Sequence, residues 1–329
     1  MSTHAVNVIR IPVVEKHPMA DTLGMVKIGG YTCVTKLGGF VEGDLAVYIE
    51  PDYVVPEGRP EFAFLDGHNR IKARKFRGVY SHGLLIPAEP DMHEGQDVME
   101  RLGIVRYEPV LEGDADEVPH PSLSGLSAYD VENWRSRSKN AEPGLARAWR
   151  DLFTPGEEVI VTEKIHGESA RFCWREGRMW ISSKNRWKLL DSATSWARAL
   201  RDNPWLTSWC RDHEDSVLFG EVHGHLKGFD YGVPRGKIGF RAFDRKILGV
   251  WQDARDFVCS GELETMGMVP LIYAGPYNHA LMEELAEGDS LIGKHMREGI
   301  VIKPAVERLD PELGRVMLKL VSNRYLEKS

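Results

Sequence analysis

Short apolar runs separated by turn-forming glycines fill the first third of the chain. The runs are Val6–Ile11, Met25–Ile28, Tyr31–Val34, Leu45–Ile49, Ile71–Ala73 and Leu84–Pro87. Gly29-Gly30 and Gly38-Gly39 lie between them, as turn residues do between strands. About five or six short strands joined in this way are typical of a small β-barrel. We therefore expect residues 1–108 to form one.

The pattern then changes twice. Residues 109–145 have no clear period and include the acidic, proline-bearing stretch Glu112–Pro121, so we expect a linker. Within it, we expect the segment Tyr129–Trp134 to pack on the second domain.

Strands and helices are mixed in residues 146–329. The predicted strands are Glu158–Thr162, Ala170–Trp174, Met179–Ser182, Val217–Val222, Lys237–Asp244, Leu271–Tyr273, Gly299–Lys303 and Val316–Leu320. Helices are predicted at Ser192–Arg201 and Ala254–Thr265. Strands and helices do not alternate regularly, so antiparallel sheets flanked by helices, an α+β fold, are expected.

Composition indicates an ordinary soluble protein. The chain has 329 residues, 42% of them hydrophobic and 28% charged, which is enough for two domains. We expect neither a membrane span nor a signal peptide, and the four scattered cysteines favour the reducing cytoplasm. The net charge of −7 argues against non-specific coating of nucleic acid but allows a local basic groove.

The stretch Glu163–Ser169 carries the strongest chemical signal. Apolar, β-prone residues lie on both sides of it, so it predicts a strand, a turn at His166-Gly167 and a second strand. A lysine at such a strand end, here Lys164, can be half-sheltered and can act as a nucleophile through a lowered pKa. The alternative for this stretch alone is an exposed turn lysine.

Further short motifs follow on or beside predicted strands. They are Ser182–Arg186, Leu218–Gly224, Gly239–Asp244, Arg297–Pro304 and Val316–Leu320. Together they supply what nucleotidyl transfer requires: an amine nucleophile, cations for phosphate charge, carboxylates for a divalent metal and an aromatic ring for a base. Side chains at several strand ends of one sheet can converge on one cleft.

These motifs, in this order, resemble the covalent nucleotidyltransferases, which include polynucleotide ligases and RNA capping enzymes. Lys164-Ile165-His166-Gly167 has the Lys-x-His-Gly form of RNA ligases, and Glu298-Gly299-x-Val301-x-Lys303 is also closest to that branch. The N-terminal barrel resembles the OB-like module that precedes the catalytic domain in RNA ligases of the Deinococcus and Naegleria type. Its segment His17–Ile28 also resembles the opening of the OB-type barrel in certain tRNA-binding domains. We expect no OB domain after the last motif, because residues 320–329 are too few.

The resemblance implies a role for each nucleotide-binding residue. Lys164 would attack the α-phosphate of ATP and hold AMP, and Glu163 would accept a hydrogen bond from the adenine amine. Phe243 would stack on adenine, with Phe240 as the alternative. His166 would act in the later steps.

The resemblance also implies a metal site and a 5′-phosphate site. Glu298 would hold Mg²⁺ or Mn²⁺ through waters. Glu221 would contact the ribose or the hydration shell of the metal, and Asp244 would support its strand or the metal. Arg186 would reach the ribose and the incoming 5′-phosphate, with Lys184 as the alternative.

Two lysines would neutralise the α-phosphate. These are Lys303 and Lys319. The family's last motif often has a second lysine two positions before the one represented by Lys319, but Met317 stands there. Arg315 and Arg324 are the alternatives for that missing contact.

The implied function is an ATP-dependent RNA ligase that joins 3′-OH and 5′-phosphate ends through a covalent lysyl-AMP. Its partner would be nicked RNA duplexes or broken RNA ends, including RNA/DNA hybrids, and it would act as a monomer in RNA repair. The alternatives are a DNA ligase, a GTP-dependent capping enzyme of the same fold, or a catalytically weak tRNA- or RNA-binding protein. A basic patch on the barrel would be either a solvated hairpin or an RNA contact; it consists of Lys72, Arg74, Lys75 and Arg77, with Phe76 and Tyr80 between them.

Overall fold

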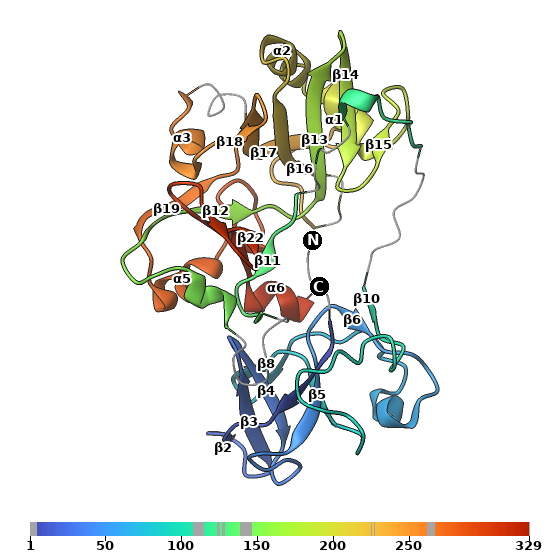
Figure 1. Ribbon diagram of the computed structural model, residues 1–329, viewed down its shortest axis with the longest axis vertical. Helices are drawn as coiled ribbons and strands as arrows, with labels where there is room; N and C mark the ends of the chain where they lie inside the picture. The colour runs from blue at the N-terminus through green and yellow to red at the C-terminus, as the bar shows by residue number, and fades with distance from the viewer. Residues whose placement is uncertain are drawn as a thin grey trace. The chain divides into compact units, whose positions relative to one another are not determined.

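The computed structural model describes residues 5–107, 115–123, 126, 129–138, 147–224, 226, 228–261 and 267–328. The chain divides into two compact units (Figure 1). The first unit comprises Met1–Pro109, Glu132–Leu152 and Asn323–Ser329, and the second comprises Val110–Val131 and Phe153–Ser322. The predicted linker, residues 109–145, is therefore divided between the units, and its residues 139–145 lie outside the described part.

The first unit is built from short antiparallel strands. One sheet has the order β1-β5-β9 and another the order β2-β3-β4. The strands are β1 (Asn7–Arg10), β2 (Val14–Lys16), β3 (Leu23–Ile28), β4 (Tyr31–Lys36), β5 (Leu45–Ile49) and β9 (Leu84–Pro87). The shorter elements are β6 (Tyr53–Val54), β7 (Arg74–Phe76), β8 (Val79–Ser81), β10 (Val105–Arg106) and the helix α6 (Asn323–Lys328).

Alternation along these strands sets the core of the first unit. Val8, Val47 and Ile49 are almost completely buried, whereas the neighbours of Val8 in β1 are only partly buried. The prediction of a strand at Ile71–Ala73 is wrong. Ile71 donates its backbone N–H to Tyr53 and is buried, but regular pairing begins only with the hairpin of β7 and β8.

Two antiparallel sheets form the second unit. The larger has the order β15-β14-β13-β16-β17-β18, and the smaller contains the consecutive neighbours β23-β20-β12-β19. The larger sheet consists of β13 (Glu168–Arg175), β14 (Arg178–Ser183), β15 (Trp187–Lys188), β16 (Val217–His223), β17 (Gly239–Ile247) and β18 (Val250–Trp251). The strands that the second unit contributes to the smaller sheet are β12 (Glu158–Lys164), β19 (Leu271–Pro276), β20 (Gly299–Pro304) and β23 (Leu318–Val321).

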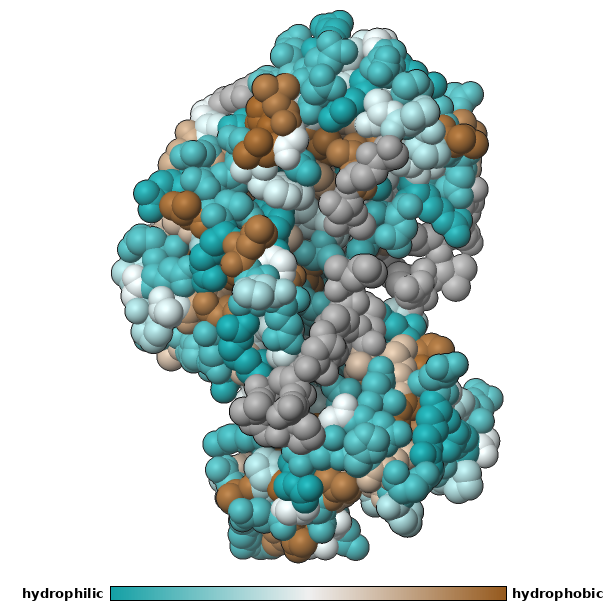
Figure 2. Space-filling view, in the orientation of Figure 1, coloured by the Kyte–Doolittle hydropathy of each residue, from teal (hydrophilic) through white to brown (hydrophobic). Residues whose placement is uncertain are grey.

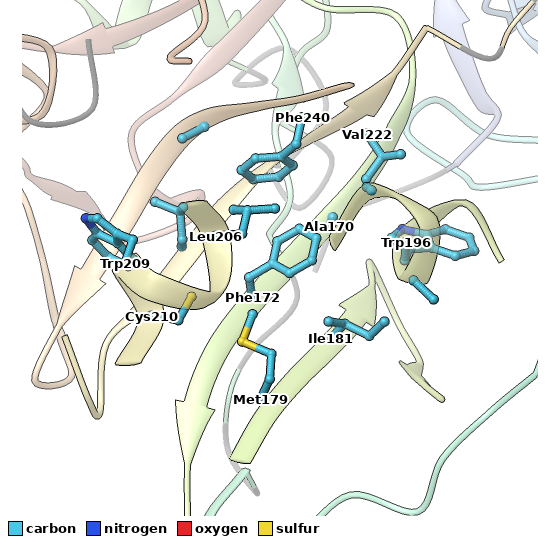
Figure 3. Packing of buried hydrophobic residues seen from close by; sticks show 14 of the residues in the cluster. Ala170, Phe172, Met179, Ile181, Trp196, Leu206, Trp209, Cys210, Val222 and Phe240 are labelled. Atoms are coloured by element: carbon cyan, nitrogen blue, oxygen red, sulfur yellow. The ribbon is translucent and has the colours of Figure 1, made fainter. Parts of the chain in front are cut away.

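Helices α1 (Ser195–Asp202) and α2 (Trp205–Asp212) cover one face of the larger sheet. Thr194 caps α1 by accepting a hydrogen bond from the backbone of Ala197. Figure 3 shows Phe172 of β13 packed between Leu206 of α2 and the neighbouring strands. This apolar layer fixes the strands from which the candidate site residues emerge.

The helices of the second unit differ in part from those predicted. Of the predicted helix Ala254–Thr265, the structure shows α3 (Ala254–Val258), and residues 262–266 lie outside the described part. Helices α2 and α5 (His279–Ala286) were not predicted. Both are only two turns long, and so short a segment gives a weak periodic signal.

The surface facing the viewer in Figure 2 is mainly hydrophilic, with hydrophobic residues in small separate groups. In the described part of the chain, every helix is too short or too polar to cross a bilayer.

Candidate active site

The predicted strand–turn–strand around Lys164 is present. Strand β12 ends at Lys164, and β13 begins at Glu168. The backbone N–H of His166 donates a 2.7 Å hydrogen bond to the hydroxyl of Tyr231, which fixes the turn. Only glycine fits at position 167, because a Cβ there would lie 2.1 Å from the carbonyl oxygen of Val222.

Lys164 is half-sheltered and ion-paired. Its Nζ donates a 2.7 Å hydrogen bond to Glu298 Oε1, and its side chain is 23% exposed. His166 Nδ1 lies 3.6 Å from the other oxygen, Glu298 Oε2. That oxygen is buried and has no hydrogen-bond partner among the described residues. The candidate nucleophile and the candidate metal ligand are therefore immediate neighbours.

A second, partly buried carboxylate stands beside this pair. Glu221, on β16, is held near Lys164 because Ser169 of β13 is its direct strand partner. Burial raises the pKa of Glu221 to about 8, Lys164 opposes this, and the nearby Glu298 adds to it. Burial would also raise the pKa of Glu298, but Lys164 and His166 hold that pKa below its ordinary value. The pKa values of the two carboxyl groups near Lys164 are thus shifted in opposite directions.

Lys164 and the two candidate phosphate-binding lysines share one face of the smaller sheet. Lys303 pairs with Ile160, which lies four residues before Lys164 on β12, and Lys319 pairs with Val301. Directly paired residues, and residues two apart on one strand, point to the same side of a sheet. Because Lys303 lies opposite Ile160, its position on the sheet is roughly 13 Å from that of Lys164, measured along the strand.

The amine of Lys303 is held by a buried ionic network. Its Nζ donates to Asp244 Oδ2 and to the carbonyl oxygen of Phe243, both at 2.8 Å. Arg315 and the hydroxyl of Tyr129 donate to the same Asp244 oxygen at 3.0 and 2.7 Å. Burial would raise the pKa of Asp244, but Lys303 and Arg315 hold it below its ordinary value. The carboxylate of Asp244, which was expected to support the metal, therefore already accepts hydrogen bonds from three protein side chains at Oδ2.

An apolar cluster lies next to Lys164. Ile165, Tyr231 and Val269 form a buried cluster, and Phe243 packs against it. The alternative ring, Phe240, is buried in the core of the larger sheet, so of the two predicted rings Phe243 is the one that packs against the cluster next to Lys164.

Glu163, the residue before Lys164, provides a buried polar group. Its carboxylate is buried, and Oε2 accepts a 2.8 Å hydrogen bond from the backbone of Leu291. Oε1 is buried without a hydrogen-bond partner among the described residues. A buried acceptor beside an aromatic ring fits an adenine amine, which would satisfy it.

The candidate 5′-phosphate residues are paired with the segment predicted as a linker. Arg186 lies 3.1 Å from Asp116, and the buried Lys188 also reaches Asp116 at 2.8 Å. Lys184 lies 3.0 Å from Asp130. Residues 115–123 and 129–131 therefore belong to the second unit through charge pairs that no periodic pattern could reveal.

Met317 stands in an apolar environment. It is buried in a cluster with Phe219, Tyr129 and Trp180, where an unpaired lysine would be strongly unfavourable. Arg315, one of the alternatives for the missing phosphate contact, bonds Asp244 and Glu307. The other alternative, Arg324, belongs to the first unit.

A family model described as RNA ligase matches residues 157–321, which include all the candidate site residues. The chain belongs to the RNA ligase family. A family model described as an OB-fold domain matches residues 5–88. The predicted family and fold class are thus confirmed for this RNA ligase: an N-terminal OB-fold domain and an α+β ligase domain.

Solved structures of similar fold agree with this assignment. A lysine-to-alanine mutant of Naegleria gruberi RNA ligase with ATP and Mn is 23% identical, with a TM-score of 0.78 and 99% of both chains covered. A lysine-to-methionine mutant of the same enzyme with AMP and Mn has the same identity and TM-score and covers 99% of this chain and 98% of its own. The Naegleria enzyme with PPi is 22% identical with a TM-score of 0.76, again covering 99% and 98%. Among curated proteins, no match was found.

The donor set fits a hydrated divalent metal better than a complete protein cage. Among the described residues, no three His, Cys, Asp or Glu side chains are arranged to hold a metal alone. The open oxygen of Glu298 and the neighbouring Glu221 are hard oxygen donors, which suit Mg²⁺ or Mn²⁺ that keeps waters and phosphate ligands.

Sequence reasoning missed Tyr231 and Tyr129. Tyr231 supports the turn at His166, and Tyr129 bonds Asp244, yet both lie in irregular segments. The aromatic character of residues 129–134 was the available signal for Tyr129, and none was available for Tyr231.

Proposed function

We propose that this RNA ligase is ATP-dependent and seals 3′-OH and 5′-phosphate ends through a covalent adenylate on Lys164. The observation that carries the proposal is the half-sheltered Lys164 amine at 2.7 Å from Glu298, next to the unsatisfied acceptor of Glu163. The Naegleria structures that contain ATP or AMP with Mn support the choice of nucleotide and of a divalent cation.

In the first step the neutral Lys164 amine attacks the α-phosphorus of ATP. A phosphorus–nitrogen bond forms, the bond to the pyrophosphate oxygen breaks, and the amine loses a proton. Glu163 accepts from the adenine amine while Phe243 packs on the base. Lys319 and Lys303 face the same side of the sheet as Lys164, so we assign them to neutralising the phosphate charge.

Glu298 and Glu221 would hold the metal, chiefly through water. A divalent cation bound there would neutralise phosphate charge and, by competing with Lys164 for Glu298, would favour the neutral amine.

The second and third steps transfer AMP to RNA and then release it. The 5′-phosphate oxygen attacks the lysyl-AMP phosphorus, which breaks the phosphorus–nitrogen bond and returns the amine. The 3′-hydroxyl then attacks the activated 5′-phosphate, and AMP leaves. Arg186 is the preferred cation for the 5′-phosphate and Lys184 the alternative, since both stand at the turn between β14 and β15. We assign His166 to orienting these later steps.

The proposed substrates are nicked RNA duplexes or broken RNA ends, with ribose required at the 3′-hydroxyl side and with RNA/DNA hybrids accepted. A 2′-hydroxyl is the group that distinguishes such ends from DNA. We further propose that the enzyme acts as a monomer in the cytoplasm, in repair of broken RNA.

Intact mass after incubation with ATP and Mg²⁺ or Mn²⁺ tests the reaction. Wild type should gain the mass of one AMP, Lys164→Ala should gain none, and the exposed-lysine control Lys237→Ala should behave as wild type. A gain from GTP in place of ATP would indicate a capping enzyme, and sealing of DNA nicks alone would indicate a DNA ligase. RNA binding without any adduct would indicate a binding protein that has lost catalysis.

A further inference from the structure

The first unit contains a pocket lined mainly by positive side chains. Its volume is about 380 Å³, and its charged lining consists of Arg10, Lys27, Arg137, Arg147, Arg150 and Asp151. Five cations therefore face one carboxylate, in a protein whose net charge is −7. We call these five cations the barrel cation cluster. It is separate in sequence from the basic patch at residues 72–77.

The backbone holds one side of this pocket in place. The turn between β3 and β4 contacts the segment after residue 132: Gly30 N–H donates a 3.0 Å hydrogen bond to the carbonyl oxygen of Arg135. Gly29 has a φ of 61°, and a Cβ on it would lie 2.9 Å from that oxygen and 3.1 Å from Arg137 Cγ. Glycine at position 29 thus lets the arginine-bearing segment approach the barrel.

A second set of contacts fixes the other arginines. Ser138 N–H donates to the carbonyl oxygen of Arg147 at 2.8 Å, and Trp149 N–H donates to that of Ser136 at 3.0 Å. The Arg150 guanidinium lies 5.6 Å from the ring centre of the fully buried Trp134. These contacts bring residues distant in sequence to one place, as a built binding site requires.

Acidic side chains lie beside several members of the cluster. Arg10 pairs with Glu94 at 2.8 Å, and Lys27 lies 3.4 Å from Glu15. Arg150 has Asp151 at 3.8 Å. Arg137 and Arg147 are exposed on the surface. Like charges held close together repel one another, so an anionic ligand that enters the cluster is favoured.

We propose that the barrel cation cluster binds the phosphodiester backbone of an RNA strand. Arginine is suited to this because its planar donors match phosphate oxygens two at a time. Apolar lining from Ile9, Pro12 and Ile28 gives a surface for a ribose or base beside the phosphates. Arg137, Arg147 and Arg150 lie outside both matched segments, 5–88 and 157–321, so neither family match covers this site. The proposal rests on the proposed RNA ligase function only in naming RNA as the bound nucleic acid.

The test neutralises the two exposed arginines together, as Arg137→Gln/Arg147→Gln. Affinity for a 5′-hydroxyl, nicked RNA duplex should fall on the order of 10-fold at about 0.1 M salt. The slope of log K against log salt concentration should become shallower by roughly 1.5, because two phosphate contacts are lost. Arg137→Lys/Arg147→Lys keeps the charge and should recover most of the affinity. Arg211→Gln/Arg235→Gln, which removes two exposed positive charges from the second unit, is the matched control and should bind RNA as wild type.

Lysyl-AMP formation, measured by intact mass, separates the possible ligands. It should be unchanged in the glutamine double variant if the cluster binds RNA. Slower lysyl-AMP formation with unchanged RNA affinity would show instead that the cluster holds the triphosphate of the nucleotide, and would overturn the proposal. Unchanged RNA affinity and unchanged salt slope would overturn it as well. If wild type forms no lysyl-AMP but the variant still loses RNA affinity, the proposed ATP chemistry fails and the binding site stands.

Discussion

Lys303 and Asp244 form a buried ion pair, with Lys303 Nζ 2.8 Å from Asp244 Oδ2 and both side chains at most 10% exposed. The same carboxylate oxygen also receives hydrogen bonds from Arg315 and Tyr129. A lysine expected to serve only the phosphate therefore also belongs to the structural centre of the ligase domain. Burial lowers the pKa of Lys303, and Asp244 counteracts that effect.

Asp244→Asn should destabilise the protein strongly. It leaves the Lys303 cation buried without its carboxylate partner and removes one of the two carboxylates that pair with Arg315. Breaking a buried pair of this kind costs about 3–5 kcal/mol in the free energy of unfolding. Chemical denaturation measures this change. The control is Lys237→Met, which removes an exposed pair with Asp202 and should change stability by less than about 1 kcal/mol. Equal effects of the two variants would mean that the network contributes no more than a surface pair.

Glu221→Gln should change how stability depends on pH. The folded protein keeps Glu221 protonated up to a pKa of about 8, whereas the unfolded chain ionises it near its ordinary value. Because the folded state then binds the extra proton, the free energy of unfolding of wild type falls as pH rises between these values. The glutamine variant lacks this contribution, so it should gain stability relative to wild type from about pH 5 to about pH 8.

Urea unfolding of both proteins across that pH range measures the effect. Glu158→Gln, which changes an exposed carboxylate on β12, should keep the wild-type dependence. Parallel curves for wild type and Glu221→Gln would show that the Glu221 carboxyl group titrates normally in the folded protein.

Glu163→Gln should weaken the choice of adenine. The wild-type carboxylate has a buried acceptor with no described partner, and a hydrogen bond to a charged group contributes about 1.5–3 kcal/mol. The amide is a weaker acceptor and offers a donor as well. Lysyl-AMP formation from ATP should therefore slow by roughly 10- to 100-fold, and the preference for ATP over GTP should narrow. An unchanged preference would place Glu163 outside base recognition.

Met317→Lys should not restore a missing catalytic group. Met317 lies in an aromatic and aliphatic cluster, so a charged amine there would be buried without a partner and should cost more than about 3 kcal/mol of stability. Lysyl-AMP formation should be no faster than in wild type. Met317→Leu keeps the volume and should cost less than about 1.5 kcal/mol, which makes it the control. A faster reaction with lysine would show that the position faces the phosphate.

The strands of the ligase domain were largely predictable because their apolar runs are long and bounded by turn residues. Glu158–Thr162 and Gly299–Lys303 agree with β12 and β20 to within two residues. The short strands of the first unit and the two-turn helices were less predictable from the sequence. Ile71 and Ala73 are apolar because they are buried, but they lie just before the hairpin instead of within it.

The candidate site was predictable as a set of residues but not as a set of partners. Lys164, Glu298 and Glu221 follow from motifs, and the structure brings them together. The pairing of Asp244 with Lys303 depends on contacts between two sheets that no local pattern encodes. The roles of Asp116 and Asp130 depend on a segment whose acidic, irregular composition resembles that of a linker.

The pairing of β12 with β20 means that the number of residues in β12 decides which face of the sheet the Lys164 amine lies on. Successive side chains on a strand point to opposite faces, so deleting or inserting one residue between Ile160 and Lys164 would turn the amine to the face opposite Lys303 and Lys319. The length of this strand is therefore as strict a requirement for the enzyme as the identity of the lysine itself.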